Sequence, residues 1–241
     1  MEALKEFSQK DVIELLKELG STLKSETTIY MIGGCNMSLK GIKLITRDVD
    51  LVVLTKEEYI TLKKALIDLG YECREETFCE DFYKTPIVVF LKEDKRIDVF
   101  IKNVSNQIKL TVEMQKRSQK YDKFGNLTVM LISNEDIFLF KSITDREKDV
   151  DDCKVLIAQN INWNTIKQEL HSQETRALWR FWVYEQLARI RNKYGEIIPK
   201  EMLDYIWELI KEKYQLKPAD FMDGIEDERL KTLTKKLDKS L

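Results

Sequence analysis

Residues 32–51 read IGGCNMSLKGIKLITRDVDL, and this stretch is the most informative part of the chain. Gly33 and Gly34 directly follow an apolar run, while Asp48 and Asp50 stand at the start of the next one. Aspartate is depleted in strands, because its short polar side chain competes with the backbone and packs poorly on a pleated surface. Two aspartates at this spacing therefore indicate a functional requirement.

The spacing of the two aspartates indicates what that requirement is. Side chains two residues apart on a strand point to the same face, so we expect the Cβ atoms of Asp48 and Asp50 to lie roughly 6.5–7 Å apart. Carboxylates at this distance can share divalent ions. Without a cation they repel each other, and one of them is driven to its neutral form. The pair therefore predicts bound Mg²⁺.

A third carboxylate follows in residues 96–101, RIDVFI, which alternate in the manner of a strand. Their apolar side chains at odd positions are expected to face one way, and Asp98 the other. If this strand lies beside that of Asp48 and Asp50, three carboxylates converge on one open face of a sheet. A glycine bend and three such carboxylates suit metal-assisted transfer from a nucleoside triphosphate.

These residues resemble the signature of the DNA polymerase β-like nucleotidyltransferase superfamily. That signature is a hydrophobic residue and Gly-Gly or Gly-Ser, a spacer, and then Asp-hydrophobic-Asp/Glu-hydrophobic, here Asp48 to Leu51. Asp98 stands where the superfamily carries its third carboxylate, and the likeness covers roughly residues 27–102. It implies an enzyme that takes a nucleoside triphosphate (NTP), such as ATP, with Mg²⁺ or Mn²⁺. The enzyme would transfer the nucleoside monophosphate to a hydroxyl and release pyrophosphate.

In that reading Asp48, Asp50 and Asp98 are the catalytic residues and the metal ligands. Gly33 and Gly34 let backbone N–H groups approach the phosphates, where a side chain would block them. Each feature has a structural alternative. The glycines could form an ordinary tight turn, the aspartate pair could be a hydrated strand end, and Asp98 could face solvent on a charged hairpin.

Thr46 and Arg47 precede the aspartate pair. Members of the superfamily often carry Ser or Thr at the position of Thr46, which implies that it fixes the loop or bonds a phosphate. Arg47 is interpreted either as a contact to nucleotide phosphate or as an ordinary surface charge, and the sequence does not decide between them.

Residues 141–152, KSITDREKDVDD, form a second charged cluster. They resemble the Lys…Arg-x-Lys-Asp-x-x-Asp pattern that follows the catalytic sheet in abortive-infection-type nucleotidyltransferases. The resemblance implies that Lys141 contacts the triphosphate, a task that suits the compact charge of a lysine. Asp149 and Asp152 share one helix face and are expected to pair with neighbouring basic side chains. The alternative is a charged junction between two helices.

Periodicity predicts strands in the first part of the chain and helices in the second. Predicted strands cover residues 27–32, 48–54, 86–91, 96–101, 108–113 and 127–132, and predicted helices cover 11–24, 36–40 and 56–69, with helices alone from residue 133. The fold class is therefore α+β, a nucleotidyltransferase-type mixed sheet with flanking helices followed by a C-terminal all-helical lobe. We expect two domains, a catalytic domain of residues 1–132 and a helical domain of residues 133–241.

Composition and the absence of other motifs limit the classes of protein to which the chain could belong. The formal net charge of −2 does not by itself indicate nucleic-acid binding, although a local basic face is compatible with it. Four cysteines without a CxxC pair and a single histidine give no zinc motif. The sequence contains no GxxxxGKS/T, GxGxxG, HExxH or GxSxG. Neither a signal peptide nor a run of ~18 apolar residues is present, so we expect a cytoplasmic protein with no membrane partner.

The acceptor is not indicated by the sequence: tRNA or another RNA, a protein and a small molecule all stay open. Aromatic and arginine side chains around residues 179–191 suit stacking on unpaired bases, although a buried helix is favoured. A rival interpretation is a catalytically silent antitoxin or regulatory binding module. A third is a toxin that modifies tRNA and has an antitoxin as its partner protein.

Overall fold

The computed structural model describes residues 6–76, 87–104, 108–144, 146–173, 179–195 and 197–214. The first residue of the predicted strand 86–91, Pro86, lies outside this part, as does Asp145 of the second charged cluster.

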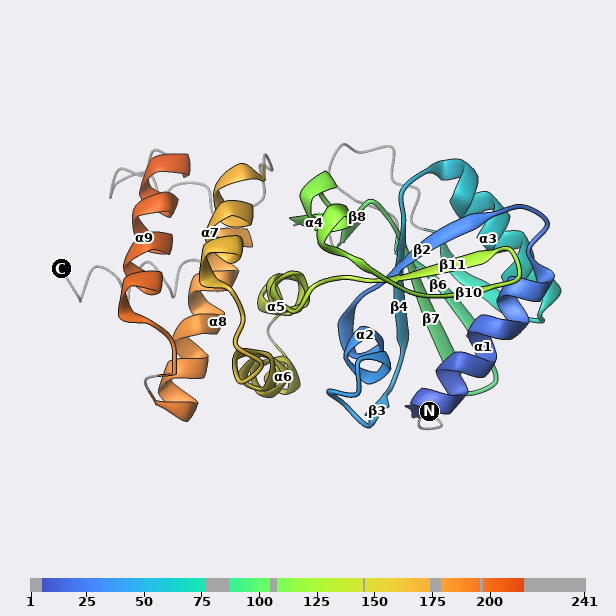
Figure 1. Ribbon diagram of the computed structural model, residues 1–241, viewed down its shortest axis with the longest axis horizontal. Coiled ribbons are helices and arrows are strands. Elements are labelled where there is room, and N and C mark those ends of the chain that lie inside the picture. Colours follow the sequence, from blue (N-terminus) through green and yellow to red (C-terminus); the bar gives the residue numbers. More distant parts are fainter. Residues whose placement is uncertain are drawn as a thin grey trace.

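A seven-stranded mixed sheet occupies the first part of the chain, with the order β10-β11-β2-β4-β7-β6-β5 (Figure 1). The pairs β4–β7 and β2–β11 are parallel, and the other pairs are antiparallel. The strands of this sheet are β2 (Thr27–Met31), β4 (Val49–Val53), β5 (Glu72–Glu76), β6 (Ile87–Lys92), β7 (Lys95–Ile101), β10 (Gln119–Phe124) and β11 (Leu127–Leu131). Two short pairs accompany it, β1 (Phe7–Ser8) with β3 (Ile45–Thr46) and β8 (Asn103–Val104) with β9 (Ile108–Lys109).

Helices lie on both sides of the sheet (Figure 1). The helices α1 (Gln9–Thr22) and α3 (Lys56–Asp68) lie on one side, and the helical second part of the chain lies on the other. The remaining helices are α2 (Gly33–Leu39), α4 (Val112–Arg117), α5 (Asn134–Ser142), α6 (Glu147–Ile157), α7 (Trp163–Ser172), α8 (Trp179–Tyr194) and α9 (Lys200–Tyr214). This arrangement confirms the predicted α+β class with a C-terminal helical region. Of the helices described, none has both the length and the apolarity to cross a bilayer.

The two faces of the sheet belong to two buried apolar clusters. One face packs on α1 and α3 through side chains such as Leu16, Leu51 and Val99. The cluster on the other face includes Val52 and Phe100 and continues into the helices of the second part. Strand alternation therefore places Asp50 and Asp98 on the face that meets the helical part.

Local signals in the sequence set several element boundaries. Thr55 Oγ1 accepts from Glu58 N at 3.1 Å, and the Glu58 carboxylate accepts from Thr55 N at 3.0 Å, which forms a capping box at the start of α3. Gly70 follows α3 with a φ of +86°, a conformation that favours glycine after a helix. A two-residue turn at Glu93 and Asp94 joins β6 to β7, which confirms the predicted hairpin.

Several elements differ from the sequence prediction. The predicted strand 108–113 is wrong beyond Lys109, because Thr111 caps a helix by accepting from Met114 N at 3.1 Å. The strands β5 and β10 were not predicted, since their sequences are mostly charged or polar. Both strands form the outer edges of the sheet. Charged residues at edges discourage pairing with other chains and also remove the apolar alternation that identifies a strand.

A buried charge network joins the sheet region to the helical part. Arg117 donates to Asp136 Oδ1 on α5 at 2.7 Å and to Glu169 Oε1 on α7 at 2.6 Å. Asp136 and Glu169 are 0% and 2% exposed, respectively. The hydroxyls of Ser133 and Thr111 donate to the same two carboxylates. The guanidinium of Arg117 therefore links α4 to α5 and α7.

Replacing Arg117 by methionine should lower the free energy of unfolding by about 3 kcal/mol, because two buried carboxylates lose the guanidinium that faces them. The neighbouring Lys116 offers a matched control, since its ammonium pairs with Glu113 on the exposed surface at 2.7 Å. Lys116→Met should change the stability by less than about 1 kcal/mol. Urea unfolding of the two variants measures the difference, and equal losses would contradict a structural role for the Arg117 network.

Candidate active site

The glycine bend, Gly33 and Gly34, follows β2 and forms the start of α2, so this helix covers Gly33–Leu39 instead of the predicted residues 36–40. Gly33 has a φ of +61°, and a Cβ atom on it would lie 2.4 Å from Asp50 Oδ2. A Cβ atom on Gly34 would lie 2.7 Å from Thr46 Oγ1. Real Cβ atoms do not approach oxygen atoms this closely, so a side chain at either position would displace the Asp50 carboxylate or the Thr46 hydroxyl. The bend is therefore fitted against the acidic strand, which a generic tight turn would not need.

The predicted carboxylates come from two neighbouring parallel strands. Asp50 on β4 is the direct register partner of Asp98 on β7, so both side chains stand on the same face of the sheet. Asp48 lies just before β4, whose first residue is Val49, so the strand begins one residue later than predicted. The structure thus places the three predicted acids on adjacent segments.

Burial and repulsion from the neighbouring acids raise the pKa of the central carboxyl group, that of Asp50. Burial raises the pKa of Asp50 to about 8, and the charges of Asp48 and Asp98 add to this rise. The cationic side chains of Lys141 and Arg146 oppose it. At neutral pH this carboxyl is therefore held largely protonated in the absence of a metal ion, as the spacing of the acids predicts.

Asp98 has a partner that sequence reasoning missed. Arg96 donates from Nε to Asp98 Oδ1 at 2.7 Å and from Nη2 to Asp98 Oδ2 at 2.8 Å. Burial raises the pKa of the Asp98 carboxyl, and this bidentate contact offsets only part of the rise. Arg96 stands two residues before Asp98 on the same strand, so strand alternation could have placed it on the same face.

The carboxylates of this site suit Mg²⁺, which substrate phosphates help to bind, better than they suit a metal ion that is held by protein side chains alone. Within the part of the chain that the structure describes, no three Asp, Glu, His or Cys side chains already surround one point. Mg²⁺ keeps several waters and is usually held by one or two carboxylates together with substrate phosphates. Asp48 and Asp50, beside a bend that lacks side chains, fit that pattern.

A cavity of about 220 Å³ lies against Asp48 and Asp50 and reaches the helical part, whereas Asp98 and Gly33 are not among its lining residues. Gly34, Asp48 and Asp50 line it from the sheet side. The lining also includes the basic side chains of Lys43, Arg47, Lys141, Arg146 and Lys148. Paired acids and several cations around one cavity are the features expected of a site for a metal ion and a polyanion.

Thr46 and Arg47 occupy different environments at this cavity. Thr46 is buried, and its hydroxyl donates to the backbone oxygen of Asp48 at 3.1 Å, so it fixes the loop before the acids. The Arg47 side chain is exposed, and its Nε lies 3.8 Å from Glu6 Oε1 at the cavity wall.

Lys141 lines the cavity but is deeply buried. Its Nζ donates to Asp149 Oδ1 at 2.8 Å and to Asp152 Oδ2 at 2.6 Å. Arg146 Nε donates to Asp149 Oδ2 at 2.6 Å, and these cations help to lower the pKa of Asp149 to about 2. The second charged cluster therefore forms a network at the wall of the cavity. A contact between Lys141 and a triphosphate stays a prediction.

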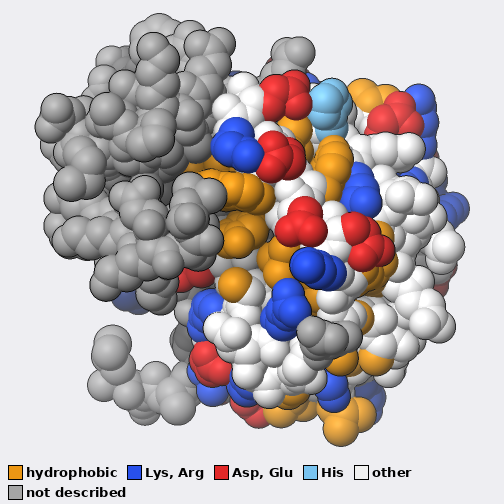
Figure 2. All heavy atoms as spheres, turned by 90° about the vertical axis from the view of Figure 1, so that its left-hand side faces the viewer, with side chains coloured by type: hydrophobic (Ala, Val, Ile, Leu, Met, Phe, Trp, Pro, Cys, Tyr) orange, Lys and Arg blue, Asp and Glu red, His pale blue; other side chains and the backbone are white. Residues whose placement is uncertain are grey.

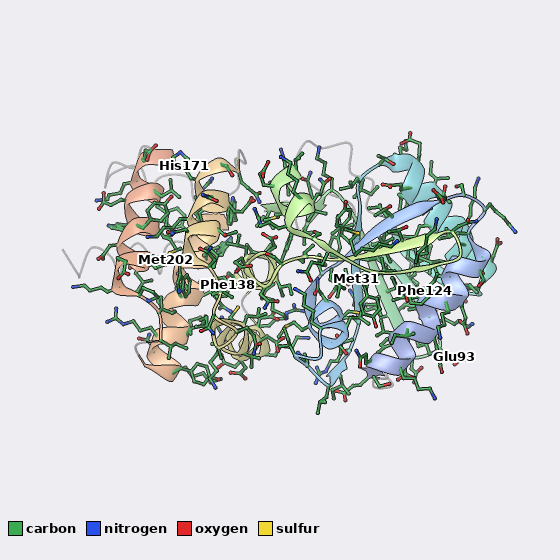
Figure 3. The ribbon with its side chains drawn as sticks, viewed as in Figure 1. Met31, Glu93, Phe124, Phe138, His171 and Met202 are labelled. Atoms are coloured by element: carbon green, nitrogen blue, oxygen red, sulfur yellow. The ribbon has the colours of Figure 1, made fainter. Side chains whose placement is uncertain are left out.

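The aromatic segment at the start of α8 is part of the core. Trp179 and Phe181 are buried, and Arg180 donates to the backbone oxygens of Leu170, in the last turn of α7, and of Gln173, just after it. These side chains stabilise the helical part, as the favoured interpretation of the sequence predicts. The only histidine, His171, is exposed at the end of α7 and lies away from the sheet (Figure 3). Figure 2 shows the molecule from the end that the helical part forms. On this face, acidic and basic side chains of the described residues lie next to one another.

Comparisons with known proteins give one family and two similar structures. The profile of a family described as nucleotidyltransferase of unknown function (DUF6036) matches residues 9–200. The crystal structure of TM1012 from Thermotoga maritima, described as a candidate nucleotidyltransferase, is 11% identical. It covers 64% of this chain and 92% of its own length, with a TM-score of 0.42. The solution structure of the antibiotic-resistance factor ANT(2'')-Ia is 15% identical and covers 78% of this chain and 95% of its own, with a TM-score of 0.46. No curated protein matches the chain.

Proposed function

This chain belongs to the nucleotidyltransferase family DUF6036, and on that premise we propose that it is a Mg²⁺-dependent enzyme that transfers a nucleoside monophosphate from an NTP to a hydroxyl acceptor. The acceptor is an RNA such as tRNA, a protein or a small molecule. The single observation that carries the proposal is the register pairing of Asp50 with Asp98 next to a glycine bend that is in close contact with the Asp50 carboxylate.

The proposed reaction follows from these positions. The acceptor hydroxyl oxygen attacks the α-phosphorus, the bond from that phosphorus to the β-phosphate oxygen breaks, and pyrophosphate leaves. Mg²⁺, when bound, neutralises phosphate charge and lowers the pKa of the attacking hydroxyl. Asp48 and Asp50 would hold the ion, and Asp98 would accept the hydroxyl proton once its contact with Arg96 opens. Gly33 and Gly34 leave room for the phosphates beside the backbone.

Positioning and charge neutralisation account for most of the catalysis in this scheme, as in other phosphoryl transfers. The buried network of Lys141, Asp149 and Asp152 keeps the wall of the cavity fixed opposite the acids. The helical part, which supplies this wall, would also select the acceptor.

Incubation with each α-labelled NTP and Mg²⁺ tests the function, with total RNA, the protein itself and polyhydroxylated small molecules as acceptors. We expect label on one acceptor class, no transfer in excess EDTA, and recovery when Mg²⁺ or Mn²⁺ is restored. Calorimetry should show NTP binding that depends on the metal. A protein that binds no NTP in the presence of Mg²⁺ would contradict the proposal. Metal-dependent binding without transfer to any acceptor would favour the silent regulatory module.

A further inference from the structure

Lys43 lies in the loop between α2 and β3, and sequence reasoning gave it no role. Gly41, with a φ of +72°, turns the chain at the end of α2. The amides of Ile42 and Lys43 then donate to the backbone oxygen of Met37, at 2.9 Å and 3.3 Å. These contacts fold the loop back along α2, so that Lys43 returns to the glycine bend.

The ammonium of Lys43 stands directly beside this bend. Its Nζ lies 3.9 Å from the position that a Cβ atom on Gly34 would occupy. Lys43 lines the same cavity as Asp48 and Asp50. A polyanion that approaches the backbone at Gly34 would therefore meet this ammonium.

Lys43 and Lys141 differ in the exposure of their side chains and in the number of carboxylates that they contact. The Lys141 side chain is 5% exposed, and its Nζ contacts two carboxylates. The Lys43 side chain is 28% exposed, and its Nζ contacts the two oxygens of a single carboxylate, Asp152, at 2.9 Å and 2.8 Å. A lysine has three donors on a flexible stem, so Lys43 can turn toward a phosphate while keeping a contact to Asp152.

The charges around Lys43 favour an anion at this place. Asp152 bridges Lys43 and Lys141, while Asp149 contacts Lys141 and Arg146. Three cations thus share two carboxylates, which leaves positive charge in excess on the wall of the cavity. This charge faces Asp48 and Asp50 across a cavity that all three cations line.

We propose that Lys43 is the residue that contacts the phosphates of the nucleotide, positioned over the glycine bend by Asp152, while Lys141 supports the wall from behind. This inference rests on the proposed function, because it names a substrate contact of that site. It predicts that Lys43 recognises the phosphates beyond the α-phosphate, which an NMP lacks.

Calorimetry with a non-hydrolysable ATP analogue and with AMP, each with Mg²⁺, tests the assignment. Lys43→Met keeps the apolar stem and removes the charge, so the affinity for the ATP analogue should fall about 10- to 100-fold. The affinity for AMP should change less than about threefold. Lys43→Arg should restore most of the binding of the ATP analogue. Lys123→Met is the matched control on the edge strand β10, where the lysine pairs with Glu26, and it should bind as the wild type does.

The outcomes separate this inference from the proposed function. A wild-type protein that binds the ATP analogue and a Lys43→Met variant that binds it equally well would overturn the lysine assignment alone. A loss of equal size for ATP analogue and AMP would also overturn it, because the contact would not depend on the outer phosphates. A wild-type protein that binds neither nucleotide would overturn both. Thermal unfolding of each variant shows whether the fold is retained.

Discussion

Replacing Asp50 by asparagine should reduce nucleotidyl transfer by about 10³-fold or more while making the metal-free protein more stable. Activity falls because the variant loses the carboxylate that stands between Asp48 and Asp98. Stability rises because burial and the two neighbouring acids hold the pKa of Asp50 near 8, so the folded state disfavours its charged form at neutral pH. We expect the free energy of unfolding at pH 7 in EDTA to increase by about 1–4 kcal/mol.

The direction of the change in stability can be checked by measuring the free energy of unfolding at several pH values. A carboxyl whose pKa is raised on folding contributes its full stability below its unfolded pKa of about 4 and loses it progressively up to the folded value of about 8. In EDTA the stability advantage of Asp50→Asn should therefore grow between these two pH values. Asp122→Asn, on the exposed edge strand β10, is the control and should show no such trend. An Asp50→Asn protein that is as active as the wild type would refute the assignment of this residue.

The second large effect is expected at Gly33. Alanine at this position places a Cβ atom 2.4 Å from Asp50 Oδ2, so the carboxylate has to rotate out of its place. We expect transfer to fall by about 10²-fold or more, because a misplaced ligand loses much of the benefit of positioning. The positive φ of Gly33 adds a backbone cost of about 1–2 kcal/mol.

Gly195, which follows α8 and lies outside the cavity lining, offers a control that isolates the contact with the carboxylate. Its φ of +80° is similarly unfavourable for alanine, but nothing lies within 4 Å of a Cβ atom at this position. Gly195→Ala should therefore lose a similar amount of backbone stability and keep most of the activity. Transfer rates and thermal unfolding of both variants test this, and equal activity in the two variants would contradict the account of the bend.

The residues of the acidic site could be predicted because each one breaks a local rule. Asp48 and Asp50 occupy positions where apolar or β-branched side chains are normal, and Gly33 and Gly34 follow a strand that would otherwise continue. Alternation of apolar residues also placed Asp98 on the correct face of its strand. From the sequence, the adjacency of these two strands was stated only as a condition, which the register of Asp50 and Asp98 fulfils, and the parallel direction of β4 and β7 was not predicted.

Some of the missed features depend on contacts between segments distant in the sequence, and others lack a periodic signal. Lys43 is an unremarkable lysine in a loop until α2 turns it toward Asp152, which lies 109 residues further along the chain. Arg117 contacts carboxylates on two helices that follow it. The edge strands β5 and β10 carry charges in place of alternating apolar residues, so no periodic signal identified them. For Lys43 and Arg117 the pattern along the chain is ordinary, and the tertiary contact alone gives the residue its role.

The most direct test of the central claim is a structure of the protein with Mn²⁺ and a non-hydrolysable NTP, with the metal located by anomalous diffraction. We predict manganese in contact with Asp48 and Asp50 and the phosphates beside the backbone of Gly33 and Gly34. Metal and nucleotide bound elsewhere on the molecule, with the carboxylates of Asp48 and Asp50 in contact with neither, would contradict the account.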